Sequence, residues 1–283
     1  MTTELNACEL NLGQFNSADL DYARRFGGIS RLYGADGLAR LQAAHICVIG
    51  IGGVGSWAAE AVARNAVGTI TLIDLDNIAE SNVNRQLHAV EGAFGKAKVT
   101  AMAERIRLIN PLANVIEIED FVTVENVSAI LNHHYDGVID CIDDAKAKMA
   151  VAAFCKQNQV PLVTVGGAGG RLDPTKIKQA DLSVVTGDRL LAKVRNGLRR
   201  DYHFPKGENH SFKSSIKSKS SKFGITAIYS DEAIVKPDAV CETEDSAIAG
   251  LNCAGYGSSV CVTAPFGFAA AANLIRQLLN TNK

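Results

Sequence analysis

The fold is decided by HICVIGIGGVG (residues 45–55), followed directly by SWAAEAVARNAVG (residues 56–68). The first stretch is a short apolar run that ends in glycines, as a buried parallel strand does, and the second has helical spacing. Glycines let the backbone turn sharply and approach phosphates, and the following helix presents unpaired N–H groups to an anion. Asp74 lies 19 residues after Gly55, at the end of the run TITLIDLD (69–76), where a carboxylate can bind ribose hydroxyls. This combination predicts a nucleotide-binding turn but does not identify the nucleotide.

The rest of the chain continues the alternation of strands and helices. Residues 95–110 have helical spacing and stop before Pro111, and residues 145–159 form another such segment. Further strands are predicted in three runs: NVIEIEDFV (114–122), YDGVIDCID (135–143) and PLVTVGG (161–167). We therefore expect an α/β fold, Rossmann-like, with a mostly parallel sheet and helices on both faces.

The flanking segments are less regular. Two short helices are expected within 18–43, and an antiparallel extension and a basic amphipathic helix after Gly170. We expect a single domain over 1–283, because no repeat or linker divides the chain. Its expected parts are N-terminal helices (18–44), a nucleotide-binding core (45–170), an irregular, basic and mobile insertion (171–250) and a C-terminal helix (251–283).

Charge is distributed unevenly along the chain. The formal net charge is −1, yet residues 186–222 hold ten Lys/Arg and three Asp/Glu, a local balance of +7 that leaves about −8 elsewhere. Such asymmetry is typical of a segment with an anionic partner. A solvated helix followed by a charged Ser-rich loop would have the same composition, and charge alone favours that second interpretation.

Cysteine usage and hydropathy favour a cytoplasmic, soluble protein. The seven cysteines are odd in number and widely spaced, no signal-peptide pattern opens the chain, and no CxxC pair indicates structural zinc. The segment 260–279 is apolar enough to resemble a membrane span, but it contains Pro265, Asn273 and Arg276. Polar groups are costly near a bilayer centre, so we expect a helix packed on the sheet instead.

Two groups of residues near the predicted crevice distinguish among nucleotides. Arg85, in SNVNRQ (81–86), and Lys98 could clamp a triphosphate, although the spacing is equally compatible with two surface cations. Asp140, Asp143 and Asp144 come at the end of a strand, where a carboxylate could hold Mg²⁺ or cap the next helix.

These motifs together resemble a known superfamily. GIGGVGSWAAEAVAR, TLIDLDNI, SNVNRQ, GKAK, AERIRLINP, DCIDD, PLVTVGGAGG with DPT, and NCAGYG are similar in order and spacing to the ubiquitin-activating-enzyme-like superfamily. Within it the chain most resembles the tRNA threonylcarbamoyladenosine dehydratase family. The resemblance runs from about Tyr22 to the C-terminus and is weakest at 206–245, where we recognise no family pattern.

The resemblance implies a role for each matching residue. The nucleotide loop would be formed by Gly50, Gly52, Gly53 and Gly55, and Asp74 would bind the ribose. Asn82, Arg85 and Lys98 would hold the phosphates, Asp143 would bind Mg²⁺, and an N-terminal arginine would reach the ATP of the neighbouring subunit in a homodimer. For that arginine YARRF offers Arg24 or Arg25, and we favour Arg25.

The resemblance also implies the reaction. A carboxylate attacks the α-phosphorus of ATP, pyrophosphate leaves, and an acyl-adenylate forms. In the family that carboxylate belongs to N6-threonylcarbamoyladenosine beside the anticodon of tRNA, and an internal nucleophile then displaces AMP and closes a ring with net loss of water. The expected cofactors are ATP, Mg²⁺ and a structural monovalent cation. The expected partners are tRNA, a second copy of the chain, and a cysteine desulfurase with its sulfur-acceptor protein.

Three features stay open under this interpretation. Cys253, in NCAG, matches a family cysteine but could be reactive or structural, and Cys241 has no assigned role. GGAGG (166–170) could admit the adenylated group or form a simple turn. Given an RNA substrate, the basic segment supplies candidate phosphate contacts: Arg189, Lys193, Arg195, Arg199, Arg200, Lys213 and Lys217.

Three other functions compete with the dehydratase. An adenylyltransferase for a ubiquitin-like sulfur carrier commonly has two CxxC pairs, which this chain lacks. A nicotinamide-dependent oxidoreductase would leave Arg85, Lys98 and Asp143 without a role. A non-catalytic scaffold would lack at least one of these residues or Asp74, and all are present.

Overall fold

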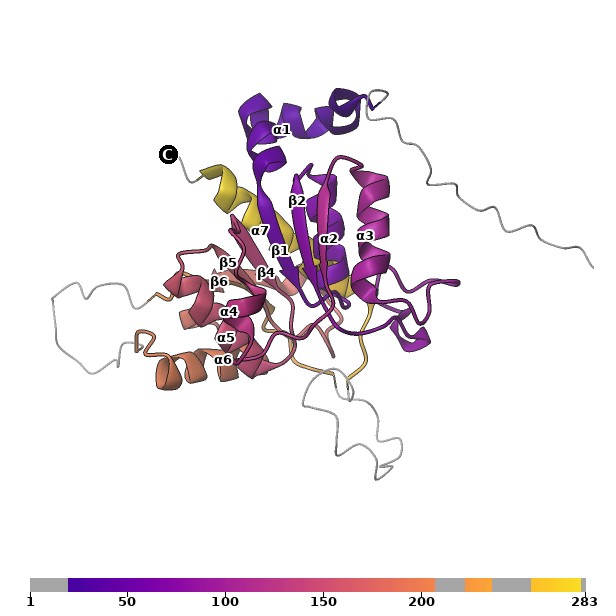
Figure 1. Cartoon of the computed structure of the whole chain (residues 1–283). Coiled ribbons are helices and arrows are strands. Elements are labelled where there is room, and N and C mark those ends of the chain that lie inside the picture. The colour runs from indigo at the N-terminus through magenta and orange to yellow at the C-terminus, as the bar shows by residue number, and fades with distance from the viewer. Residues whose placement is uncertain (1–19, 207–221, 236–255, 281–283) are drawn as a thin grey trace, which may run out of the picture.

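The computed structural model of the chain describes residues 20–206, 222–235 and 256–280. Within them one sheet has the strand order β3-β2-β1-β4-β5-β7-β6, with β6 antiparallel to β7 and the other neighbours parallel (Figure 1). The strands are β1 (His45–Ile49), β2 (Thr69–Ile73), β3 (Asn114–Ile118), β4 (Gly137–Asp140), β5 (Leu162–Val165), β6 (Ile177–Asp181) and β7 (Thr226–Ser230). The predicted mostly parallel sheet with an antiparallel extension is confirmed.

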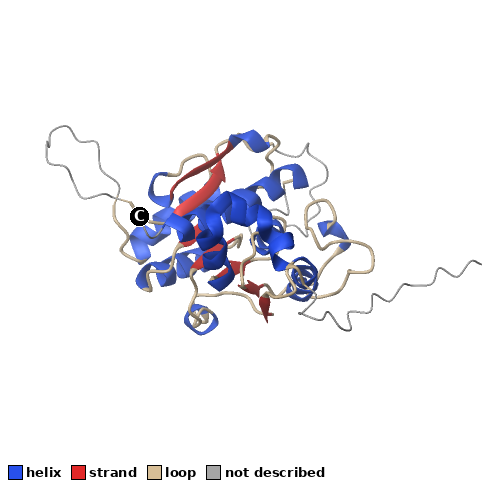
Figure 2. Cartoon of the chain, turned by 90° about the horizontal axis from the view of Figure 1, so that it is seen from above, coloured by secondary structure: helices blue, strands red, loops and turns tan. Residues whose placement is uncertain are grey.

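Helices cover both faces of this sheet (Figure 2). The helices are α1 (Tyr22–Ala43), α2 (Gly55–Arg64), α3 (Lys98–Ile109), α4 (Val127–Ile130), α5 (Ala145–Gln157), α6 (Arg189–Asp201) and α7 (Val260–Asn280). In β1, Ile46 and Val48 pack with α2, α3 and α7, whereas Cys47 and Ile49 pack with α4, α5 and α6. Because successive side chains of a strand point to opposite faces, a run that is apolar throughout serves two hydrophobic cores. The continuous apolar runs of the sequence therefore predicted a sheet buried on both sides.

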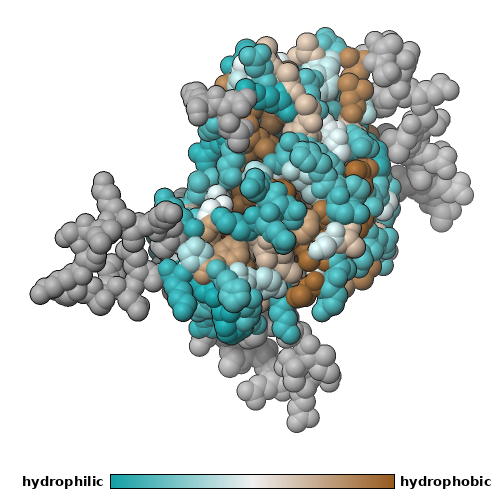
Figure 3. Space-filling model, turned by 60° about the vertical axis from the view of Figure 1, so that its left-hand side comes forward, coloured by the Kyte–Doolittle hydropathy of each residue, from teal (hydrophilic) through white to brown (hydrophobic). Residues whose placement is uncertain are grey.

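The N-terminal and C-terminal helices agree with expectation in outline. α1 is two helical segments joined at Gly34, whose backbone has φ 80° and ψ 166°. α7 crosses the sheet against α2, and a Cβ at Gly267 would lie 2.5 Å from the carbonyl oxygen of Val54, so the glycine permits the close approach. None of the helices in the described ranges is long and apolar enough to span a membrane. On the face seen in Figure 3, apolar residues lie in small groups among hydrophilic ones.

The region after residue 170 contains the predicted antiparallel extension and basic helix, and its described parts are more regular than the expected insertion. We expected an irregular, mobile insertion over 171–250, but its described parts contain β6, α6 and β7, together with 3₁₀ turns at Pro174–Lys176 and Leu182–Val184. β7 pairs with β5 and β6 pairs with β7, so the segment completes one edge of the sheet. The division at 170 therefore separates strands that belong to one sheet. α4 was also not predicted.

The topology places the site. β1 is flanked by β2 on one side and by β4 on the other, so the connections leave in opposite directions on either side of β1. A crevice forms outside the carboxyl ends of parallel strands at such a switch point. These carboxyl ends point away from α1, toward the bottom of the view in Figure 1.

Candidate active site

The glycine loop follows β1 and bends tightly over its own backbone. Gly50 has φ +82° and donates its N–H to the carbonyl oxygen of Ile73 at 2.8 Å. A Cβ at Gly55 would lie 1.8 Å from the carbonyl oxygen of Gly50, a distance no side chain can occupy. A Cβ at Gly52 would meet nothing within 4 Å. α2 begins at Gly55, and no side chain caps it, although the N–H of Ser56 donates to the carbonyl oxygen of Gly52 at 3.1 Å. The helix start therefore lacks a polar side chain that would compete with an anion.

Asp74 directly follows β2, and its carboxylate is hydrogen-bonded to the same loop. Its Oδ2 atom accepts from the N–H of Ile51 at 2.6 Å, and Oδ1 accepts from the N–H of Asp76 at 2.9 Å. Burial raises the pKa of the Asp74 carboxyl, and the nearby Lys98 ammonium opposes that rise. Each carboxylate oxygen accepts more than one hydrogen bond, so ribose hydroxyls can still bind here.

Lys98 and Arg85 converge on this edge of the sheet. Lys98 is the first residue of α3; its ammonium group lies 2.7 Å from Oδ2 of Asp76 and 4.0 Å from Oδ1 of Asp74. Arg85 is half-buried, and its stem covers the glycine loop: a Cβ at Gly53 would lie 3.0 Å from its Cγ. The two cations are therefore neighbours of the nucleotide loop, as the triphosphate hypothesis requires.

The loop that carries Arg85 is fixed from within. Asn82 is buried, and its Oδ1 atom accepts from the N–H of Ala79 at 3.1 Å, which closes the 3₁₀ turn Glu80–Asn82. Trp57 of α2 donates from Nε1 to the carbonyl oxygen of Arg85 at 3.0 Å. Asn82 thus shapes the loop in this structure, and its direct contact with a phosphate stays a prediction.

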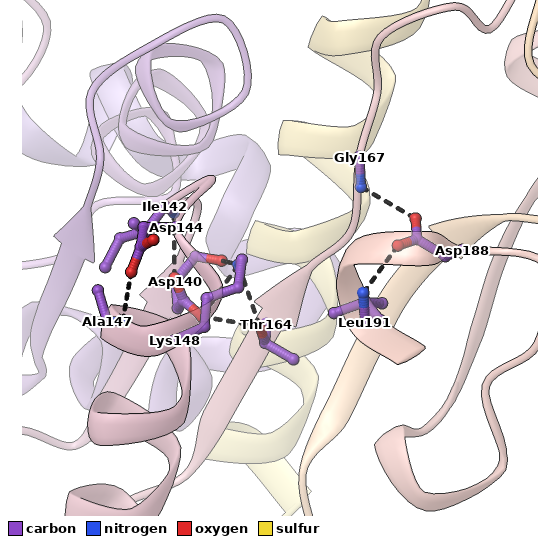
Figure 4. A network of polar contacts seen from close by, with 9 residues as sticks. All are labelled: Asp140, Ile142, Asp144, Ala147, Lys148, Thr164, Gly167, Asp188 and Leu191. Atoms are coloured by element: carbon purple, nitrogen blue, oxygen red, sulfur yellow. Dashed lines mark hydrogen bonds and ion pairs between the residues drawn. The ribbon is translucent and has the colours of Figure 1, made fainter. Parts of the chain in front are cut away.

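Three carboxylates lie at the end of β4 or just after it, and each has a different environment; Figure 4 shows two of them, Asp140 and Asp144. Asp140 is completely buried and pairs with Lys148 at 3.0 Å. Asp144 is the N-cap of α5 and accepts from the N–H of Ala147 at 2.8 Å. Asp143 is exposed and makes no hydrogen bond or ion pair within the described ranges. The cap and the free carboxylate are therefore two different residues, and Asp143 is the one available to a ligand.

The glycine run after β5 joins this edge to the basic helix. The N–H of Gly167 donates to Oδ2 of Asp188 at 2.9 Å, and Oδ1 of Asp188 accepts from the N–H of Leu191 at 2.9 Å (Figure 4). Asp188 is the N-cap of α6, and a Cβ at Gly166 would lie 2.3 Å from its carboxylate. A side chain at position 166 would therefore collide with the carboxylate of Asp188 that caps α6. The start of α6 lies beside the carboxyl end of β5.

Three of the arginines predicted to contact tRNA are engaged by the protein itself. Arg195 donates to the carbonyl oxygen of Val185, and Arg199 donates to the carbonyl oxygens of Ser183 and Pro205 at 3.1 and 3.2 Å. Arg200 forms an ion pair with its neighbour Asp201 at 2.7 Å. These contacts hold Arg195 and Arg199 against neighbouring segments and pair Arg200 with an adjacent carboxylate, so each has fewer N–H groups left for a phosphate. Contact of these three arginines with tRNA stays a prediction.

Arg189 and Lys193 are the described members of that set without such a contact. Both are exposed, lie one turn apart on α6, and make no hydrogen bond or ion pair with the described part of the chain. Lys213 and Lys217 lie outside the described residues, as do Cys241 and Cys253. For those four residues the structure adds nothing to the sequence hypotheses.

Arg25 is not brought to the site of its own chain. It is exposed, and its Nη1 group donates to the carbonyl oxygens of Ile109 at 2.8 Å and Leu108 at 3.3 Å. These residues end α3, whereas Lys98 begins it, about 16 Å away along the helix axis. Arg24 is likewise exposed on α1. A contribution from either arginine would have to reach the site of another subunit.

Several residues of the site escaped the sequence analysis. Asp76 holds Lys98, Lys148 holds Asp140, and His88 lies 2.9 Å through Nε2 from the carbonyl oxygen of Ile51. Lys148 alone had a signal: helical spacing puts it on the apolar face of 145–159, where a lysine needs a buried partner. Cys141 lies beside the glycine loop, but burial raises the pKa of its thiol to about 12, so it is not a nucleophile at neutral pH.

Stability at acid pH is expected to depend on His88. Burial lowers the pKa of its imidazole from 6.5 to about 4, and Nδ1 has no hydrogen-bond partner in the described chain. The imidazole therefore binds a proton near pH 6.5 in the unfolded chain, but only near pH 4 in the folded chain. Stability should fall as pH drops through that window, by about 3 kcal/mol in total from this group. Urea unfolding at several pH values gives the free energy of unfolding as a function of pH. Its slope between pH 6.5 and about 4 should be shallower in His88→Gln, which cannot take up that proton. Equal slopes in the two proteins would exclude His88 as the cause.

The donor set fits a nucleoside triphosphate and a divalent cation. The open space at Gly52 and the uncapped start of α2 suit phosphates, the two cations suit their charge, and the buried Asp74 suits a ribose. The exposed carboxylate of Asp143 is an oxygen donor of the kind Mg²⁺ takes beside phosphates. No group of three or more candidate metal ligands occurs in the described ranges, so any Mg²⁺ would rely on phosphates and water as well.

Comparisons with known proteins agree with this geometry. The sequence matches the ThiF family over residues 22–282. It is 48% identical over 262 residues to tRNA threonylcarbamoyladenosine dehydratase of Haemophilus influenzae, an alignment that covers 92% of this chain and 95% of that protein. Crystal structures of the Escherichia coli tRNA N6-threonylcarbamoyladenosine dehydratase in complex with ATP and with AMP are each 43% identical. Both superpose with a TM-score of 0.79 and cover 91% of this chain and 95% of theirs.

Proposed function

This chain belongs to the ThiF family, and from that premise we propose that it cyclises N6-threonylcarbamoyladenosine beside the anticodon of tRNA in an ATP-dependent dehydration. The observation that carries the proposal is that Asp74, Arg85 and Lys98 lie around the glycine loop, while Asp143 is exposed in the turn after the neighbouring strand β4. A nicotinamide enzyme would need the first of these alone. The high identity to dehydratases over nearly the whole chain supports the choice of carboxylate.

Each of these side chains has a task in binding ATP. The glycine loop and the start of α2 would take the phosphates on backbone N–H groups, and Asp74 would accept the ribose hydroxyls. Arg85 and Lys98 would bind phosphate oxygens, with Lys98 leaving Asp76 to do so. Asp143 would hold Mg²⁺, which when bound shields phosphate charge and orients the chain of phosphates.

The reaction is a transfer at phosphorus followed by a transfer at carbon. A carboxylate oxygen of the threonyl group bonds to the α-phosphorus, and the bond to pyrophosphate breaks. An internal nucleophile then bonds to the acyl carbon, AMP leaves with the former carboxylate oxygen, and one water is lost overall. Arg85 and Lys98 would stabilise the charge that develops on the phosphoryl oxygens, and positioning would supply much of the remaining rate.

Other parts of the proposal concern the assembly and the compartment. A homodimer would let Arg25 reach the neighbour's ATP, since in its own chain it lies at the far end of α3. Action in the cytoplasm fits the tRNA substrate and the four described cysteines, Cys47, Cys141, Cys155 and Cys261, which are all free thiols. The structural monovalent cation and the desulfurase partner stay predictions from family resemblance.

The proposal is tested by incubating the full chain with ATP, Mg²⁺ and tRNA that bears N6-threonylcarbamoyladenosine, followed by mass spectrometry of the nucleosides. We expect the nucleoside to lose one water and ATP to yield AMP and pyrophosphate. Arg85→Ala should abolish both, whereas Arg64→Ala, an exposed arginine at the far end of α2, should not. Unchanged nucleosides together with pyrophosphate exchange that requires a sulfur-carrier protein would point to the rival adenylyltransferase.

Binding of tRNA is expected to depend on Arg189 and Lys193. Because both face solvent beside the carboxyl edge of the sheet, replacing both with Ala should remove two phosphate contacts. The slope of log K against log salt should then become shallower by about 1.5 to 2. Arg200→Ala is the matched control on the same helix, since that arginine is already paired with Asp201. A slope unaffected by the double change would remove α6 from the RNA interface.

A further inference from the structure

A buried lysine lies beneath the site, at the carboxyl end of β4. Lys148 is in the first turn of α5 and has no exposed surface. Its ammonium group lies 3.0 Å from Oδ2 of Asp140, 3.1 Å from the carbonyl oxygen of the same residue and 3.2 Å from Oγ1 of Thr164 (Figure 4). Three acceptors match the three N–H groups of an ammonium ion, so this buried lysine is fully hydrogen-bonded.

Asp140 extends this network to the loop that follows β4. Its Oδ2 atom accepts from Lys148 and from the hydroxyl of Thr164, the latter at 2.7 Å, and its Oδ1 atom accepts from the N–H of Ile142 at 3.0 Å. A carboxylate that bonds the backbone two residues ahead fixes a turn locally. The carboxylate must stay turned inward, toward Lys148, for that turn to keep its shape. The residue directly after Ile142 is Asp143.

The other end of the loop is also fixed. Asp144 caps α5 through the N–H of Ala147 at 2.8 Å, which sets where the helix begins. Asp143 is held between these two anchored residues and projects as the exposed carboxylate of the turn. Asp140 and Asp144 therefore fix the shape of the loop, and Asp143 is the carboxylate that the loop exposes to solvent.

The cost of this arrangement makes a purely stabilising purpose a weak explanation. Asp140, Lys148 and Thr164 are each at most 1% exposed. Desolvation of a buried ion pair offsets most of its attraction, and well-packed apolar residues often stabilise a fold as well or better. Removing one partner, in contrast, leaves a buried charge that must protonate or turn toward solvent. For Asp140 a turn toward solvent would release the N–H of Ile142.

We propose that Lys148 is a positioning residue for the metal-binding carboxylate: it holds Asp140 inward, and Asp140 in turn holds the loop that presents Asp143 to Mg²⁺. The inference rests on the proposed function, because it takes Asp143 to be the ligand. It adds a buried residue, remote from substrate, whose effect should be seen in metal affinity.

The test measures binding of Mn²⁺, as a paramagnetic probe for Mg²⁺, to the full chain saturated with a non-hydrolysable ATP analogue. Electron paramagnetic resonance gives the free Mn²⁺ concentration directly, without catalysis. We expect Lys148→Met to weaken Mn²⁺ binding about tenfold, the lower end of what loss of a residue behind a ligand typically costs. Mg²⁺ dependence of pyrophosphate release should shift by a similar factor.

Two further proteins separate positioning from general damage. Arg105→Met removes one of the two arginines that pair with another buried carboxylate, Glu60, which Arg105 contacts at 2.7 Å on the α2–α3 face, and it should leave Mn²⁺ binding unchanged. The double variant Asp140→Asn with Lys148→Met should recover affinity to within about threefold of wild type. An Asn at 140 can still accept from Ile142 and donate to Thr164 without a buried charge.

Each outcome bears on a different claim. Mn²⁺ affinity of Lys148→Met within twofold of wild type and of Arg105→Met overturns the positioning role. Undiminished Mn²⁺ binding by Asp143→Asn overturns the proposed metal ligand itself, whatever Lys148→Met does. If Lys148→Met does not fold, Thr164→Val keeps the ion pair but deprives Lys148 of one acceptor and should weaken binding about threefold. Unchanged affinity in that variant would then overturn the proposal.

Discussion

Replacing Lys98 with Met should lower the rate of AMP formation by about 10² to 10³. Lys98 is 5% exposed and lies against the glycine loop's acidic neighbours, so its ammonium group acts in a site from which water is largely excluded. Met keeps the length of the side chain but removes the charge. The change also leaves Asp74 and Asp76 without their counter-ion, which should repel a triphosphate and raise the KM for ATP.

The measurement is AMP release from ATP with the modified tRNA, analysed for kcat and for the KM of ATP separately. Lys96→Met is a close control: that lysine lies two residues earlier, is exposed, and pairs with Glu104 at 2.8 Å away from the nucleotide loop. It should retain the wild-type rate within a factor of about two. A Lys98→Met enzyme with a rate less than tenfold below wild type would mean that Lys98 does not touch the reacting phosphate.

Replacing Gly55 with Ala should prevent the nucleotide loop from forming. The new Cβ would lie 1.8 Å from the carbonyl oxygen of Gly50 and 3.3 Å from Cβ of Cys141. Because the first of these is a backbone atom in a turn, it cannot move aside as a flexible side chain would. We expect a destabilisation of about 3 kcal/mol or more, with loss of ATP binding.

Thermal unfolding with and without ATP measures both effects, and Gly52→Ala gives the contrast. A Cβ at Gly52 meets nothing within 4 Å, so the empty protein should keep its melting temperature. The added methyl group would still stand where the backbone approaches phosphate, and the stabilisation by ATP should shrink. Gly55→Ala that melts like wild type would show that the loop is looser than its geometry indicates.

The sequence predicted the sheet because each parallel strand is buried on both faces. Ile46, Cys47 and Val48 are all buried, so no hydrophilic residue interrupts the run. The roles of the basic residues after 170 were harder to predict, because composition gives the charge of a side chain but not the groups that it contacts. Arg199 looks like a phosphate ligand in sequence, yet it donates to two carbonyl oxygens and lies over the ring of Phe223 at 5.3 Å.

The site was predicted at the level of which segments meet, and less well at the level of which side chain points where. Spacing could place three acids at the end of β4 but could not distinguish the buried Asp140 from the exposed Asp143. That distinction is made by Lys148 and Thr164, which come from other elements. His88 and Asp76 had no detectable signal, because their importance depends on tertiary contacts with Ile51 and Lys98.

Adenylation of a carboxylate is the central claim, and an isotope label tests it most directly. The threonyl carboxylate of the modified tRNA is labelled with oxygen-18, and AMP from a single turnover is analysed by mass spectrometry. Attack of that carboxylate on the α-phosphorus predicts AMP that carries one labelled oxygen, together with the dehydrated nucleoside. Unlabelled AMP, or ADP with labelled phosphate, would contradict an acyl-adenylate and assign the activation to different chemistry.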